Sequence, residues 1–265
     1  MGYRYGFTPR HAYVFDTIMT CLSGHHAHWG AKSLREVRVD WELMVIWGVE
    51  KRSTTRRELA EITGEKAAFL SRVIGGYRKA GTVTERRSTA DARMSYLEAG
   101  PGVLSMFETY QAALEYWERL GGGWSDPGWW AVTVRDFLRG AVADSRNNPR
   151  YTIRQLLIDV TVGSYDVLEG RAADIGEIAQ VVGVSRKVIA DATTSMVWSR
   201  SIEAEPHPTD GRKTMFRYVA TDEQRQSWVT FFEARARETG VTDQYQSPGV
   251  MLAHELAQEP GGERA

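Results

Sequence analysis

The stretch Glu58-Leu59-Ala60-Glu61-Ile62-Thr63-Gly64 predicts a short amphipathic helix that ends in a tight turn, because glycine readily adopts the left-handed backbone that closes a helix. A stretch of the same kind returns 119 residues later, as Glu177-Ile178-Ala179-Gln180-Val181-Val182-Gly183. Around the two stretches, Leu34 to Leu97 aligns with Ile153 to Phe216 without a gap, and apolar positions fall on apolar positions. A shared pattern of buried positions indicates one fold present twice.

Each copy predicts helices followed by a short β-ribbon and a closing helix, so the expected fold class is mostly α with short β-ribbons. In the first copy the expected elements are helices over Pro9 to Leu22 and Leu34 to Lys51, a short helix capped at Thr55, a helix over Glu65 to Ala80, strands over Thr82 to Arg87 and Met94 to Glu98, and a helix over Val103 to Leu120. In the second copy they are a helix over Gly128 to Ala141, a short helix capped at Asp174, a helix over Ser185 to Ser199, a ribbon that opens at Ile202 to Glu205, a helix over Asp222 to Thr239, and a short tail helix over Val250 to Gln258.

The length of 265 residues is enough for two ordinary domains, and Gly121-Gly122-Gly123 marks the expected division. We therefore expect a first unit over 1–123, a second over 124–240 and a C-terminal tail over 241–265. The single cysteine excludes an intrachain disulfide framework, and the sequence has neither the apolar run of a signal peptide nor eighteen consecutive apolar residues. These features predict a cytoplasmic protein that does not interact with a membrane.

The formal net charge of -1 conceals an uneven distribution of charge. Residues 51–97 contain eleven Lys or Arg against five Asp or Glu, which gives +6, whereas the equivalent residues 170–216 are nearly balanced. The first unit therefore has the basic excess that favours binding to a polyanion.

The order helix, turn, helix and two-stranded wing resembles the MarR family of winged helix-turn-helix transcriptional regulators, here with two units in tandem. The most specific match is the Asp-x-Arg of the wing, which occurs as Asp91-Ala92-Arg93 and as Asp210-Gly211-Arg212. Together with the helix-turn-helix stretches and flanking helices, the resemblance covers most of the chain. It implies recognition helices over Glu65 to Ala80 and Ser185 to Ser199, which would enter the major groove of double-stranded DNA, with Arg93 and Arg212 at the wing tips.

The candidate DNA-contacting residues are basic or small polar side chains of the two recognition helices and wings. In the first unit they are Lys66, Arg72, Arg78, Lys79, Arg86, Arg87 and Arg93, and in the second Ser185, Arg186, Lys187, Thr193, Thr194, Ser195, Arg212, Lys213 and Arg217. Asp191 and Glu203 would oppose binding if they faced the phosphates. Gly75-Gly76 departs from the family inside the first recognition helix, and predicts either a kink or close packing.

MarR-like proteins generally dimerise through their outer helices, so the covalent pair predicts an intramolecular pseudo-dimer, with a homodimer of chains as an alternative. The family also implies a small aromatic effector near the junction of the units, where Trp117, Trp124, Trp129 and Trp130 cluster, although aromatic residues there equally suit interface packing.

Other features of the sequence have plain structural explanations. His25, His26 and His28 lack partners at metal-ligand spacing and predict a solvated loop, and Cys21 predicts a small core residue rather than a redox sensor. The recurring Asp40 and Asp159 are expected to pair with Arg35 and Arg154 or with the wing arginines. No catalytic motif is present, so we expect no enzyme, cofactor or metal.

The expected function is therefore sequence-specific regulation of transcription, as a repressor for example. Two alternatives remain, a tandem winged-helix module for protein association in a chromosome-structuring complex and a plasmid-type replication initiator.

Overall fold

The computed structural model describes residues 7–30, 32–91, 93–104, 107–108, 110–111, 128–144, 151–219, 221–241 and 245. Within these residues the chain is mostly helical and contains two antiparallel sheets of three strands each, which confirms the expected fold class at this level. No helix in the described ranges has both the length and the apolar character needed to cross a bilayer.

The two copies of the repeat fold into two lobes with the same order of elements. The first lobe consists of α2 (Leu34–Met44), the π-helical turn η1 (Val45–Val49), β1 (Thr54–Thr55), α3 (Arg56–Thr63), α4 (Ala67–Lys79), β2 (Val83–Arg87) and β3 (Ser95–Ala99). The second consists of α7 (Ile153–Ser164), η3 (Tyr165–Glu169), β4 (Ala173–Asp174), α8 (Ile175–Val182), α9 (Arg186–Trp198), β5 (Ile202–Pro206) and β6 (Thr214–Tyr218). The strand orders, β1-β3-β2 and β4-β6-β5, correspond, and the short strands β1 and β4 are additions to the expected ribbons.

Local capping explains why α3 and α8 begin and end where the sequence predicts. The side chains of Thr55 and Asp174 each accept a hydrogen bond from the backbone N–H three residues further on. At the other end, Gly64 and Gly183 take left-handed backbone angles, with φ of 65° and 73°. The same two signals therefore fix the turn between the helices of each lobe.

Two further left-handed positions show how closely the lobes correspond. Lys51, with φ of 54°, stands where the second lobe has Gly170, with φ of 70°. In the opposite sense, Gly81 has φ of 71° where the second lobe has Arg200, with φ of 59°. The backbone path is thus conserved between the lobes even where a non-glycine residue must adopt a conformation that costs free energy.

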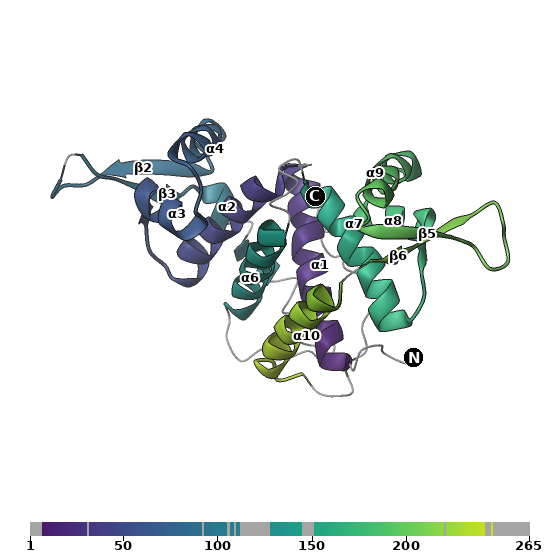
Figure 1. The fold of residues 1–265 in the computed structure, drawn as a ribbon. Helices are drawn as coiled ribbons and strands as arrows, with labels where there is room; N and C mark the ends of the chain where they lie inside the picture. Colours follow the sequence, from purple (N-terminus) through teal and green to yellow (C-terminus); the bar gives the residue numbers. More distant parts are fainter. Residues whose placement is uncertain are drawn as a thin grey trace, which may run out of the picture.

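Three helices between the lobes form the centre of the molecule (Figure 1). They are α1 (Pro9–Trp29), α6 (Trp129–Asp144) and α10 (Asp222–Arg237). Helix α1 packs against α6, α7 and α10, and Phe15 stacks on Phe232 with their ring centroids 4.0 Å apart. Every residue of α1 from His11 to His26 is buried.

The length of α1 corrects one sequence-based expectation. The helix does not end at Leu22 but continues to Trp29, and His25 and His26 are buried within it. The predicted solvated histidine loop is therefore wrong. The helix continues because its last turns pack into the protein interior, a tertiary contact that outweighs the polar composition of the segment.

The hydrophobic core does not divide at residue 123. One core joins α1 and one face of α2 to α6, α10 and the second lobe, and a smaller core lies within the first lobe around Leu59, Leu70, Ile74 and Leu97. The glycines expected at the domain boundary and the tail helix over 250–258 lie outside the described residues. The N-terminal helix thus packs with elements from the second half of the chain.

The two lobes contact each other at the starts of α2 and α7, through residues that are equivalent in the repeat. Ser33 and Thr152, which are equivalent in the repeat, form an isolated antiparallel bridge. The flanking hydrogen bonds are reciprocal, since Leu34 N–H donates to the Tyr151 carbonyl at 2.9 Å and Ile153 N–H donates to the Lys32 carbonyl at 3.1 Å. Equivalent atoms therefore meet across an approximate twofold axis.

Candidate nucleic-acid interface

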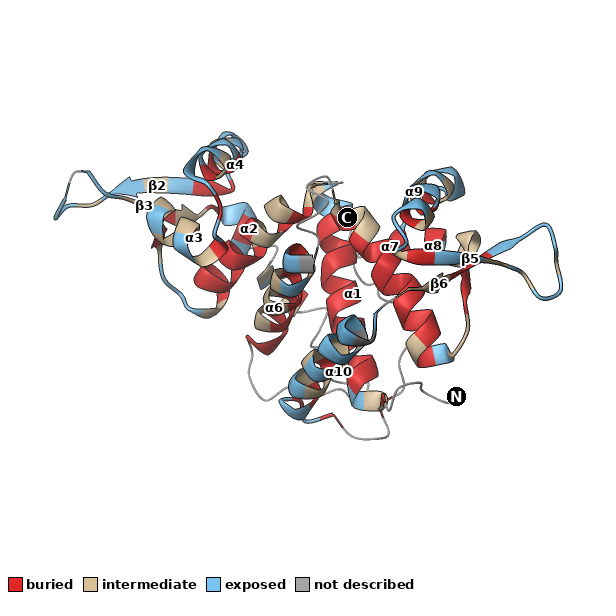
Figure 2. Ribbon diagram, in the orientation of Figure 1, coloured by how far each residue is buried: buried red, intermediate tan, exposed pale blue. Residues whose placement is uncertain are grey.

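Helices α4 and α9 lie on the same face of the molecule, and the two hairpins extend from it in opposite directions (Figure 1). Each is the second helix of a pair joined by a tight turn, α3–α4 and α8–α9. Both helices and both hairpins carry long exposed surfaces, drawn pale blue in Figure 2. The repeat thus presents two similar helix-and-hairpin surfaces together.

The amphipathic pattern of α4 determines which side chains face solvent. Leu70, Val73 and Ile74 are buried against the lobe, so the basic residues lie on the other side of the helix. Lys66 at the N-cap and Lys79 in the last turn are exposed and form no ion pair within the part of the chain that the structure describes. Both ammonium groups are therefore available to an external anion.

Each of the two arginines of α4 lies near one carboxylate. The Arg72 guanidinium lies 3.6 Å from Glu36, and the Arg72 side chain is 70% exposed. An ion pair this exposed contributes about 0–1 kcal/mol, so Glu36 holds Arg72 only loosely. Arg78 is about half exposed and pairs at 3.0 Å with Glu85, a mostly buried carboxylate that also binds Arg56.

The two glycines of α4 are not explained by close packing within the protein. A Cβ placed at either Gly75 or Gly76 would meet no atom within 4 Å. The helix α4 is continuous over both residues. The glycines leave a shallow, open part of the α4 surface.

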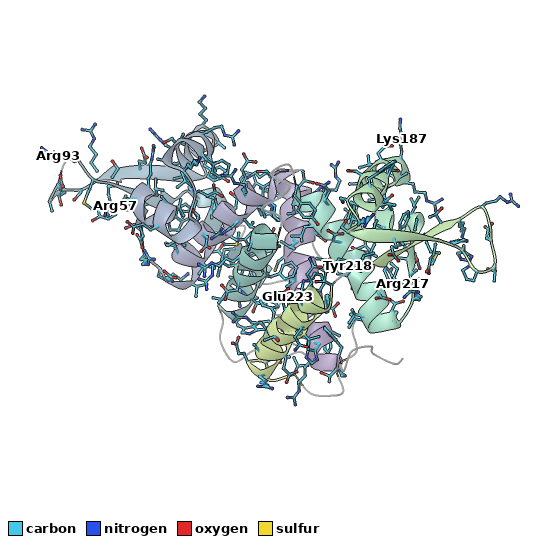
Figure 3. All side chains as sticks on the ribbon, in the orientation of Figure 1. Arg57, Arg93, Lys187, Arg217, Tyr218 and Glu223 are labelled. Carbon is cyan, nitrogen blue, oxygen red and sulfur yellow. The ribbon has the colours of Figure 1, made fainter. Side chains whose placement is uncertain are left out.

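The Asp-x-Arg pattern of the first hairpin has a turn-forming aspartate and an exposed arginine. The Asp91 carboxylate accepts a hydrogen bond from the Arg93 backbone N–H at 2.9 Å. The Arg93 side chain lies at the hairpin tip, far out from the lobe (Figure 3). Arg87 is exposed without an ion-pair partner among the described residues, whereas Arg86 pairs with Glu98 at 2.7 Å.

In α9, the polar candidates divide into exposed and buried residues. Arg186 and Lys187 are exposed in the first turn, and Lys187 projects outward from the helix (Figure 3). Ser185 is the N-cap and its hydroxyl accepts from the Val188 N–H at 3.4 Å. Thr194 and Ser195 are exposed about two turns further on.

The structure corrects the expectation that Thr193 contacts DNA. Its side chain is buried, and its hydroxyl donates to the carbonyl of Ile189 at 2.9 Å. The sequence places it in a run of hydroxyl residues, but the helical period turns this one member of the run towards the core. It is therefore excluded as a contact to a base.

The second hairpin repeats the turn of the first. Asp210 accepts a hydrogen bond from the Arg212 backbone N–H at 3.1 Å, and the Arg212 side chain is exposed. Lys213 is exposed too, with its ammonium 3.8 Å from Asp174. The Asp-x-Arg pattern thus has the same structural role in both lobes.

The structure also corrects the expectation that Arg217 contacts DNA. Its guanidinium is half-buried and pairs with Asp166 and with Glu205, which ties β6 to η3 and to β5. Figure 3 shows it on the side of the lobe away from Lys187. The arginine links elements of the lobe and does not belong to the candidate interface.

Sequence reasoning missed two exposed side chains, the basic Arg57 and the aromatic Trp198. Arg57 on α3 is 90% exposed, and its ion-pair partner among the described residues is its helix neighbour Glu61 at 3.0 Å. Trp198, at the end of α9, is 85% exposed where the first lobe has Lys79. The acidic Asp191 and Glu203 are exposed as well, so the second surface is chemically mixed.

The tryptophans expected to line an effector site pack the centre of the molecule. Trp129 stacks on Tyr13 and donates to Glu238 at 3.0 Å, and Trp130 donates to Gln111 at 2.6 Å. Trp117 and Trp124 lie outside the described residues. A cavity of about 460 Å³ lies instead between α6, α10 and the second lobe.

The two recurring aspartates do not pair with the predicted arginines. Asp40 accepts hydrogen bonds from His25 and Lys32, each at 2.9 Å, and Asp159 accepts one from the Tyr151 hydroxyl. The expected partner Arg35 binds Glu65 instead. The expectation is therefore wrong, and the two equivalent carboxyl groups have different surroundings.

Cys21 lies in the interior of α1, where burial raises the pKa of its thiol well above the usual value. A protonated, buried thiol reacts slowly with oxidants. Among the residues that the structure describes, no three His, Cys, Asp or Glu side chains form a group suited to a metal ion.

Comparison of the sequence with models of protein families gives no match, and comparison with curated proteins gives none either.

Proposed function

We propose that this protein is a DNA-binding regulator of transcription that uses two winged helix-turn-helix lobes, as the resemblance to the MarR family implies. Helices α4 and α9 would enter the major groove, and the hairpins β2–β3 and β5–β6 would act as wings on the flanking DNA. The observation that carries the proposal is the common face of α4 and α9, with the hairpins directed outward (Figure 1).

The pseudo-twofold contact supports a single chain as the functional unit. Dimeric helix-turn-helix proteins use twofold symmetry to place two recognition helices on successive half-sites. In this chain, the reciprocal bridge between the equivalent residues Ser33 and Thr152 supports a similar relation within one polypeptide. The proposed operator is therefore a pair of half-sites bound by one chain.

The basic side chains support unequal use of the lobes. In the first lobe, Lys66, Lys79, Arg87 and Arg93 are exposed and lack ion-pair partners in the described part of the chain, which favours phosphate contact. In α9 the exposed Asp191 lies one turn from Lys187. A carboxylate on a recognition helix repels phosphates but can accept a hydrogen bond from cytosine N4. Binding to the second half-site would thus depend more on contacts to bases than on attraction to phosphates.

A second candidate function applies to the second lobe alone. A tryptophan as exposed as Trp198 is typical of sites that anchor protein partners. Together with the nearly balanced charge of residues 170–216, it favours association of the second lobe with another protein.

The test is selection of binding sequences from random double-stranded DNA, followed by a footprint on the selected site. Two double variants are compared with the wild type: Arg87→Ala with Arg93→Ala, and Arg186→Ala with Lys187→Ala. We expect each pair to remove protection from a different half-site, with a lower salt dependence of binding because each lost phosphate contact reduces counterion release.

Arg237→Ala is the control, because Arg237 is also exposed but lies on α10, outside the candidate interface. Protection by the first lobe only, combined with loss of a protein partner in Trp198→Ala, would favour the second candidate function. Absence of a selected sequence and of salt-dependent binding would refute the proposal.

A further inference from the structure

The first turn of α7 contains an arginine to which the proposed DNA contacts assign no role. Arg154 forms no ion pair and no hydrogen bond within the part of the chain that the structure describes. Its Nε is buried, but the residue as a whole is partly exposed. The terminal Nη groups are therefore the part of Arg154 that an anion from outside the protein can reach.

The equivalent arginine of the first lobe is bound within the protein. Arg35 donates from Nε to Oε1 of Glu65 at 2.9 Å, and its Nη2 binds the other carboxylate oxygen. The Cζ of Arg35 also lies 4.4 Å from the ring centroid of Phe69. Glu65 is 9% exposed and immediately precedes the N-cap of α4. The charge of Arg35 is thus compensated beside the N-terminal end of α4.

The second lobe has neither of these partners for its arginine. The residues equivalent to Glu65 and Phe69 are Val184 and Val188, and an aliphatic side chain cannot bind a guanidinium. Val184 is partly exposed and immediately precedes the N-cap of α9. Since α7 packs against α9 and the lobes share one backbone path, the repeat places Arg154 beside the N-terminal end of α9.

The first turn of α9 adds two further cations at this end of the helix. Arg186 and Lys187 are both exposed there. The acidic residue of α9, Asp191, lies one turn beyond Lys187. The positive end of the helix dipole strengthens the attraction of these side chains for an anion. The N-terminal end of α9 is therefore basic, although residues 170–216 as a whole are nearly balanced in charge.

Arg154 also lies close to the contact between the lobes. It follows by two residues Thr152, which forms the bridge to Ser33 across the approximate twofold axis. In Figure 1 this contact lies between α4 and α9, towards the face that the two helices share. Because a twofold axis of the protein falls on the centre of a two-half-site operator, Arg154 corresponds to the inner edge of the second half-site.

We propose that Arg154 binds a DNA backbone phosphate next to the centre of the operator, at the inner edge of the second half-site. Its two Nη groups would donate to the phosphate oxygens, a geometry that arginine provides and lysine does not. The first lobe makes no equivalent contact, because Glu65 binds Arg35. The inference rests on the proposed function and adds to it a phosphate contact that one lobe makes and the other does not.

The first test measures binding of the selected operator by fluorescence anisotropy over a range of salt concentrations. Arg154→Ala should weaken binding about tenfold at low salt, because a charge-assisted hydrogen bond is lost. It should also reduce the slope of log affinity against log salt concentration by about 1, as expected for one phosphate contact. Arg154→Lys should retain part of the affinity, since it keeps the charge but not the bidentate geometry. Arg237→Ala on α10 is the control and should bind as the wild type does.

A designed exchange tests the comparison between the lobes. Val184→Glu places a carboxylate where the first lobe has Glu65, so it should bind Arg154 and weaken operator binding to the level of Arg154→Ala. The same substitution made together with Arg154→Ala should have a smaller effect, because no guanidinium remains to be neutralised.

Ethylation interference locates the contacted phosphate. On the wild-type complex, we expect a sensitive phosphate near the centre of the operator, on the side of the second half-site. The Arg154→Ala complex should lose this sensitivity and keep the others. Thermal unfolding of each variant without DNA should match that of the wild type.

Wild-type affinity and salt dependence in Arg154→Ala would overturn the inference. Weaker binding with an unchanged slope and an unchanged interference pattern would also overturn it, because that combination indicates a structural role. An effect of Val184→Glu that is as large without Arg154 as with it would show that the carboxylate acts on the DNA directly, against the inference. In all three outcomes the wild type still binds its operator and the proposed function stands. Absence of salt-dependent binding by the wild type would instead refute the proposed function and the inference together.

Discussion

Arg139 of α6 binds Glu42 of α2 through two hydrogen bonds, Nε to Oε1 at 2.6 Å and Nη2 to Oε2 at 2.7 Å. The Glu42 side chain is 2% exposed, so this carboxylate depends on the arginine for its compensation. A further cation, Arg38, has its Nε 3.9 Å from Oε1 of Glu42. The pair therefore fixes how the first lobe joins the central helices.

Arg139→Ala is expected to destabilise the protein by about 3–5 kcal/mol, because it leaves a buried carboxylate without its main partner. Urea unfolding monitored by circular dichroism measures the loss. The double variant Glu42→Leu with Arg139→Leu should lose less free energy of unfolding than Arg139→Ala does, since no buried charge remains at this site. Equal losses in the single and double variants would contradict this explanation.

The two equivalent aspartates predict opposite dependences of stability on pH. Burial acts to raise the pKa of Asp40, but the hydrogen bond and charge of His25, the charge of Lys32 and a hydrogen bond from Tyr77 together outweigh it, so the pKa is lowered. The contribution of Asp40 to the free energy of unfolding is present above the pKa of the unfolded state, about 3.9, and is lost as pH falls. The pKa of Asp159 is raised to about 7. Its contribution to the free energy of unfolding is therefore fully present below about pH 4 and is lost as pH rises to 7.

Asp159→Asn should therefore raise the free energy of unfolding at pH 8 by about 1–4 kcal/mol, with little change at pH 4. Asp40→Asn should lower it at pH 8, because Lys32 and His25 lose an anionic partner. Denaturant titrations at both pH values give the four differences. The same sign for both variants at pH 8 would show that the two carboxyl groups have similar surroundings.

Gly76→Ala should stabilise the protein by about 0.5–1 kcal/mol, because the residue lies inside α4 and a Cβ there meets no atom. Gly81→Ala is the matched contrast. Gly81 has φ of 71°, and alanine is strained in that region, so this variant should be less stable than the wild type. Thermal unfolding distinguishes the two. If Gly76→Ala also weakens DNA binding, the open surface of α4 lies against the DNA backbone.

Arg72→Ala or Arg93→Ala should weaken binding to the selected operator by about 1–3 kcal/mol each, if the arginine reads a base edge, and leave the unfolding transition unchanged. Both side chains are exposed, and Arg72 has only a distant carboxylate partner. Fluorescence anisotropy with labelled operator measures the effect. Unchanged affinity in both variants would remove the first lobe from the DNA surface.

The reciprocal hydrogen bonds around Ser33 and Thr152 predict that one chain binds one operator. Sedimentation of the protein alone and with operator should give the mass of one chain and of one chain per DNA duplex. An obligate dimer of chains would contradict the intramolecular pseudo-dimer, because each lobe would then have a second partner available.

The sequence by itself determined the features that depend on neighbouring residues. The constant spacing of the repeat predicted the order of elements in both lobes, Thr55 and Asp174 predicted where α3 and α8 begin, and Gly64 and Gly183 where they end. The hairpin arginines, Arg93 and Arg212, were likewise placed correctly at exposed turns. Caps, turns and helical periodicity act over a few residues, so one copy of the pattern contains the information.

Only the tertiary structure decided which side chains meet over long separations. Helix α1 continues through His25 because tertiary contacts bury this part of the helix, where His25 bonds to Asp40 and lies beside the ring of Trp41. Arg217 pairs with Asp166. Asp159 lines a cavity of about 460 Å³, whereas the equivalent Asp40 lines one of about 20 Å³. These outcomes depend on packing between elements. Asp40 and Asp159 occupy equivalent positions in the repeat, but their pKa values shift in opposite directions because their neighbours differ.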